Sequence, residues 1–99
     1  MEISDDDFIY TDMVHFAWTV ATAYYPNVPH NLFGHDEWWG PHDLSGLDSD
    51  VQYWLFLSNP ISETVKEDLN NQGKYADIVV ENGYIGTGNV WVYKVINQE

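Results

Sequence analysis

The stretch Val51-Gln52-Tyr53-Trp54-Leu55-Phe56-Leu57 decides the fold that we expect for this chain. It is rich in aromatic and other β-forming residues, and apolar side chains occupy both alternating sets of positions, which is typical of a strand covered on its two faces. Asn59-Pro60 then breaks the pattern, because proline has no backbone N–H to donate to a strand ladder. We therefore expect a central strand over residues 51–57.

A short helix is predicted directly after this strand. Ser62 can cap its first turn, and Gly73 is suited to close it in a left-handed conformation. Ile61, Val65 and Leu69 recur at intervals of four and form the side of the helix that we expect to be buried.

Two more strands are expected in the last third of the chain, near residues 76–81 and 90–96. The segment 82–89 between them contains three glycines and predicts a hairpin with a wide tip. Strict alternation divides the last strand into two faces, with Trp91, Tyr93 and Val95 on one face and Val90, Val92 and Ile96 on the other.

The amino-terminal third predicts a helix. Ser4 can cap it, and the three aspartates that follow would lie at the positive end of the helix dipole. An apolar stripe at helical spacing then runs to Tyr25-Pro26, where proline disfavours continuation; its members are Ile9, Met13, Phe16, Val20 and Tyr24.

Residues 26–50 are predicted to form a long irregular loop, since prolines and glycines interrupt them throughout. The loop contains three of the four histidines and the pair Trp38-Trp39, so it is acidic and aromatic rather than merely polar. Together these elements predict one α+β domain over residues 1–99: an amino-terminal helix, the loop, and a β-α-β-β unit with a small mixed or antiparallel sheet.

Charge is the strongest constraint on function. The 99 residues include no arginine and only three lysines against 16 acidic residues, a formal net charge of −13. Because 44% of residues are hydrophobic, we expect a folded core rather than disorder. Direct nucleic-acid binding is not expected, since phosphates are neutralised by Lys and Arg. A basic protein partner is expected instead.

Several classes of site are excluded or disfavoured by composition. The chain has no cysteine, which removes disulfides, cysteine nucleophiles and cysteine zinc clusters. It has no apolar run of about 20 residues, and its amino end is acidic, so we expect a cytoplasmic protein without a membrane partner. No cofactor is expected.

A metal site is the alternative that the loop leaves open. His30, His35 and His42, with neighbouring acids, have the ligand chemistry for zinc, iron or manganese if they converge. Their spacing is unlike the paired histidines of metalloprotease helices. No serine–histidine spacing predicts a nucleophile, and the glycines of segment 83–88 precede no helix that could bind phosphate. We therefore expect a binding protein rather than an enzyme.

Carboxylates and flat aromatic rings together suit a protein that occupies the basic groove of a nucleic-acid-binding enzyme as a DNA or RNA mimic. The expected function is a small stoichiometric inhibitor of the phage anti-restriction, anti-CRISPR or nuclease-immunity type. A metal-binding protein or metalloenzyme, an acidic adaptor that binds through its aromatics, and acidity for solubility alone are the alternatives. The partner-binding residues are predicted to be Asp5, Asp6, Asp7, Asp12, Asp36, Glu37, Trp38, Trp39, Asp43, Asp48 and Asp50.

Reversal of loop charge tests this placement. Replacing Asp36, Glu37 and Asp43 together with lysine should abolish binding of the partner while the circular dichroism spectrum stays unchanged, because like charges would then face the basic groove. Unaltered binding would place the interface elsewhere.

Overall fold

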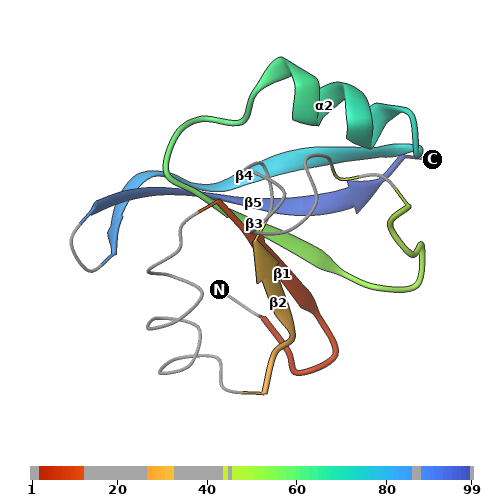
Figure 1. Cartoon of the computed structure of the whole chain (residues 1–99), viewed down its shortest axis with the longest axis horizontal. Helices are drawn as coiled ribbons and strands as arrows, with labels where there is room; N and C mark the ends of the chain where they lie inside the picture. The colour runs from red at the N-terminus through yellow and green to blue at the C-terminus, as the bar shows by residue number, and fades with distance from the viewer. Residues whose placement is uncertain (1–2, 13–26, 33–43, 45, 86–87, 99) are drawn as a thin grey trace.

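The computed structural model describes residues 3–12, 27–32, 44, 46–85 and 88–98 (Figure 1). In chain order the elements are β1 (Phe8–Thr11), β2 (His30–Leu32), β3 (Tyr53–Leu57), α2 (Glu63–Asn70), β4 (Lys74–Ile85) and β5 (Gly88–Asn97). Among the described residues, α2 is the only helix, and it lies over one face of the sheet (Figure 1). The expected α+β class is therefore confirmed for the described part of the chain.

The predicted central strand is confirmed as β3. All five of its residues are buried, and it occupies the middle of a five-stranded mixed sheet with the order β2-β1-β3-β5-β4. It pairs in parallel with β1 and antiparallel with β5. Since β4 is in turn antiparallel to β5, the strands on either side of α2 run parallel to each other with β5 between them.

The prediction of an amino-terminal helix is wrong where the structure describes it. Phe8–Thr11 form β1, with Ile9 and Thr11 fully buried and Phe8 and Tyr10 half-buried, an alternation of period two. Backbone pairing on both sides favours the strand, since β1 has parallel neighbours in β2 and β3. The rest of the predicted apolar stripe, Met13, Phe16, Val20 and Tyr24, lies outside the described residues.

The predicted irregular loop over residues 26–50 also needs correction. It contains β2, which pairs with β1 in the register Ile9↔His30, and Ile9 N donates to Pro29 O at 3.0 Å. Near its end, Leu44 is fully buried, and the Gln72 side chain fixes this segment by accepting from Leu47 N and donating to Leu44 O. These long-range contacts have no local sequence signal.

The helix α2 follows its predicted signals. The Ser62 hydroxyl accepts from Val65 N at 3.2 Å, so it caps the first turn. Leu69 is fully buried, Ile61 and Val65 pack beside it, and Gly73 adopts φ +71° after the last turn. Gln98 N then donates to Gly73 O at 2.7 Å, which ties the end of the chain to the end of this helix.

The predicted hairpin is confirmed and is longer than expected. β4 and β5 pair from Lys74↔Asn97 to Ile85↔Gly88, with shifts of register between Ile78 and Val80 and between Val80 and Gly83. Each shift inserts an extra β4 residue opposite β5, so the faces of β4 do not follow strict alternation.

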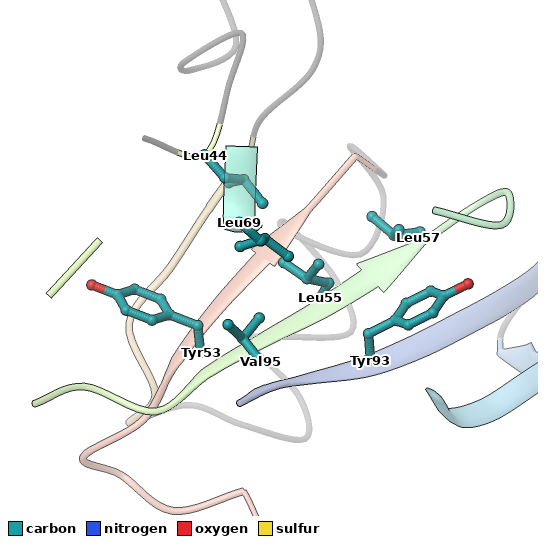
Figure 2. Packing of buried hydrophobic residues seen from close by; sticks show 7 residues of the cluster. All are labelled: Leu44, Tyr53, Leu55, Leu57, Leu69, Tyr93 and Val95. Carbon is teal, nitrogen blue, oxygen red and sulfur yellow. The ribbon is translucent and has the colours of Figure 1, made fainter. Parts of the chain in front are cut away.

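Two hydrophobic clusters cover the two faces of β3. One contains Ile9, Val28, Trp54, Phe56, Val90 and Val92. The other lies beneath α2 and contains Leu44, Tyr53, Leu55, Leu57, Leu69, Tyr93 and Val95 (Figure 2). The predicted division of β5 into two faces is confirmed for Tyr93 and Val95 against Val90 and Val92. No described helix is long and apolar enough to cross a bilayer.

Truncation of Phe56 should test how much the burial of β3 on both faces stabilises the fold. Phe56 is 0% exposed, so Phe56→Ala should lower the free energy of unfolding by about 3–5 kcal/mol through lost burial and a residual cavity. Tyr84→Ala is the control, since Tyr84 is 76% exposed and its loss should cost at most about 0.5 kcal/mol. Urea unfolding followed by fluorescence measures both; equal losses would contradict the assignment of the core.

Candidate functional site

The parallel pairing of β1 with β3 brings two acidic segments to one end of the sheet. Phe8 is in register with Tyr53, and Phe8 N donates to Gln52 O at 2.9 Å. The residues that precede each strand therefore lie at the same end of the sheet, although more than 40 positions separate them in the sequence. We call Asp5, Asp6, Asp48 and Asp50 the acidic end; all four are exposed.

The segment before β1 is a turn built around Asp7. Asp7 N donates to Ser4 O, and the Asp7 carboxylate accepts from Ser4 N and from the Ser4 hydroxyl, each at 3.1 Å. Trp54 Nε1 donates to Asp7 Oδ2 at 2.9 Å from the neighbouring strand. Asp7 is therefore buried and holds the turn against β3, while Asp5 and Asp6 are presented to solvent.

The segment before β3 is a second turn. Asp48 Oδ1 accepts from Asp50 N at 2.8 Å, and Asp48 N donates to the Tyr53 hydroxyl at 2.9 Å. Tyr53 lies on the face beneath α2, whereas Trp54, which holds the other turn, points to the opposite face. The two acidic turns thus flank the end of the sheet from both faces.

Aromatic rings pack behind the second turn. Tyr10 stacks on Tyr53 with ring centroids 5.9 Å apart, and Phe8 contacts both rings. Burial, and to a smaller extent the neighbouring Tyr53, raises the pKa of the Tyr10 hydroxyl above its ordinary value. The Tyr10 phenol therefore stays neutral at physiological pH, and carboxylates carry the negative charge here.

A shallow pocket of about 320 Å³ opens beside Asp50. Lys94 contributes its one cation, and the Lys94 ammonium lies 5.7 Å from the centre of the Trp54 ring, a cation–π distance. The pocket is lined by Ser49, Asp50, Val51, Gln52, Lys94, Val95, Ile96 and Asn97.

The three lysines of the chain all have internal partners. Lys66 pairs with Glu63 at 3.3 Å, Lys74 is 3% exposed and donates to Asn97 Oδ1, and Lys94 lies over Trp54. Acids are distributed in the opposite way, because most described ones are exposed: Asp5, Asp6, Asp48, Asp50, Glu63, Glu67, Asp77 and Glu81. The field around the described part of the chain is therefore negative.

The remaining predicted site residues fall into two groups. Asp12 lies at the other end of β1, where its carboxylate accepts from Ser58 N at 2.9 Å and from the Ser58 hydroxyl at 3.2 Å. The structure thus separates Asp12 from the acidic end. The second group lies outside the described residues: Asp36, Glu37, Trp38, Trp39 and Asp43.

The alternative metal ligands are not brought together by the described part of the chain. The His30 backbone belongs to β2, whereas His35 and His42 lie outside the described residues. No group of three or more histidine, aspartate or glutamate side chains suited to a metal ion occurs among the described residues.

Comparison of the chain with protein-family models, with curated proteins and with solved structures found no match. We therefore infer its function from the chemistry of its surface.

The contact between Asp7 and Trp54 can be tested by removing the acceptor. Asp7→Ala should lower the free energy of unfolding by about 1–3 kcal/mol, because the buried Trp54 indole N–H would lose its partner. Asp6→Ala removes the same charge from an exposed position and should cost at most about 0.5 kcal/mol. A double-mutant cycle with Trp54→Phe should be non-additive; strict additivity would show that the two side chains are not coupled.

Proposed function

We propose that this protein is a small stoichiometric inhibitor that binds the basic groove of a nucleic-acid-binding enzyme, where its carboxylates take the place of phosphates. The observation that carries this proposal is the distribution of charge: every lysine is engaged within the molecule, while eight described acids are exposed. A surface of this kind attracts basic proteins over a distance and repels nucleic acid.

The acidic end supports a defined orientation on the partner. Two acidic turns are held by backbone pairing of β1 with β3 and by the contacts of Asp7 and Tyr53. Their side-chain carboxylates are thus presented from a rigid base, which reduces the entropy lost on binding. The proposed interface also keeps the five other residues that the sequence predicts within the loop: Asp36, Glu37, Trp38, Trp39 and Asp43.

Affinity capture can test the proposal with the intact chain. Tagged protein should retain a basic nuclease, glycosylase or other nucleic-acid enzyme from lysate of its host, or of an organism that the host infects or competes with. Raised salt and added duplex DNA should both release that enzyme, since they compete for the same charges. Capture that resists both would exclude the mimic.

A pair of matched variants locates the interface. The first variant removes three exposed charges from the acidic end by combining Asp5→Asn, Asp6→Asn and Asp50→Asn. Three exposed ion pairs at about 0.5 kcal/mol each should weaken binding by roughly tenfold. The control, Glu63→Gln, Glu67→Gln and Asp77→Asn, removes as many charges from α2 and β4 and should weaken binding less. Equal losses in titration calorimetry would mean that overall charge, not the acidic end, drives association.

A second function is favoured by a separate observation. The large hydrophobic side chains that are exposed among the described residues all belong to β4: Tyr75, Ile78, Val79 and Tyr84. β4 is also an edge strand of the sheet. An acidic adaptor that binds through these apolar side chains would keep its affinity as salt is raised, whereas the mimic would lose it.

A further inference from the structure

A second pocket lies on the face of the sheet that carries α2, away from the acidic end. Its volume is about 240 Å³, and it is lined by Pro60, Ile78, Glu81, Trp91 and Tyr93. Trp91 is in register with Leu57, the last residue of β3, so the pocket belongs to the opposite end of that strand. Figure 2 shows Leu57 and Tyr93 at one end of the packed cluster and Tyr53 at the other.

The walls of this pocket are aromatic and held in place. Tyr93 is buried, and its hydroxyl accepts from Ile61 N at 3.1 Å, which ties β5 to the residues before α2. Pro60 adds a rigid backbone on the same side. Ile78, in register with Tyr93, leaves part of its side chain exposed at the rim. Tyr93 and Pro60 therefore form a fixed side of the pocket.

The irregularity of β4 explains why Glu81 reaches this pocket. Residues three apart on a regular strand point to opposite faces, so Ile78 and Glu81 would be separated by the sheet. The shift of register between Ile78 and Val80 inserts one extra residue, and both side chains then line the same pocket. Re-aiming a side chain in this way is a recurrent use of β-bulges.

The lining chemistry specifies a ligand. Glu81 is the one charged group in the lining, and it lies beside the rings of Trp91 and Tyr93. An apolar ligand would leave the carboxylate desolvated without a partner, and an anion would be repelled. A guanidinium group satisfies both parts of the lining, because it stacks on aromatic faces and donates paired hydrogen bonds to a carboxylate.

We propose that this pocket binds an arginine side chain of a protein partner, with the guanidinium stacked on Trp91 and hydrogen-bonded to Glu81. The choice of a protein as the source rests on the proposed function, which requires a basic partner. Arginine is favoured over lysine because a planar group fits between a ring and a carboxylate, whereas an ammonium is a more strongly hydrated point charge.

An NMR titration with short blocked peptides tests the pocket without any knowledge of the partner. The probes are Gly-Arg-Gly and, as a neutral analogue of the same shape, Gly-citrulline-Gly. The arginine peptide should shift the indole N–H resonance of Trp91 saturably, and the citrulline peptide should bind at least about threefold more weakly, since the charge contribution at an exposed site is modest. Equal binding of the two peptides would overturn the proposal.

Matched variants on one strand separate the pocket from the general field. Glu81→Gln should weaken the arginine peptide about two- to fivefold, the range expected for one exposed ion pair. Asp77→Asn is the control: Asp77 is also exposed on β4, but it is in register with Lys94, which lies over Trp54 on the face of the sheet opposite to the pocket. Equal weakening by both variants would attribute binding to net charge and overturn the pocket.

The outcome for the pocket is distinct from the outcome for the proposed function. If the peptide shifts resonances at Asp5, Asp6 and Asp50 but not at Trp91, the arginine pocket is wrong and the acidic end remains. If Trp91 responds as expected while the triple variant of the acidic end retains its partner fully, the pocket stands and the placement of the mimic surface fails.

Discussion

The parallel pairing of β1 with β3 is the constraint on which the rest of this structure depends. It inserts a strand from the start of the chain between β2 and the most buried strand of the sheet. The pairing covers one flank of β3, and it positions the turn whose Asp7 carboxylate receives the Trp54 indole N–H. The acidic end exists only because two parallel strands start at the same place.

The negative surface of this protein follows from its small number of lysines and its lack of arginine. With 16 acids and three lysines, ion pairs cannot neutralise the surface, and self-repulsion acts against the folded state. The fold offsets this repulsion by apolar packing on both faces of β3, where the two clusters consist of buried side chains. Two of the three lysines serve packing instead: Lys74 lies in the interior and Lys94 covers an aromatic ring.

The two proposed binding features differ in physical character. The acidic end presents exposed carboxylates on two short turns, which suits long-range attraction and fast association. The pocket at Trp91 combines aromatic surface with one carboxylate, which suits recognition of a single side chain at close range. They lie at opposite ends of β3: the acidic end precedes Tyr53, the first residue of β3, whereas the pocket includes Trp91, which is in register with Leu57, the last residue of β3. A groove lined with basic residues along its length could contact both.

Local sequence determined those elements whose signals are complete within a few residues. The uninterrupted apolar run of β3, the Ser62 cap and Gly73 end of α2, and the alternation in β5 all act through near neighbours. Only the tertiary structure decided that Phe8–Thr11 form a strand, because its hydrogen-bond partners come from residues 29–32 and 52–56. The placement of the two acidic turns at one end of the sheet and the re-aiming of Glu81 likewise depend on strand order and register, which are set by contacts between distant segments.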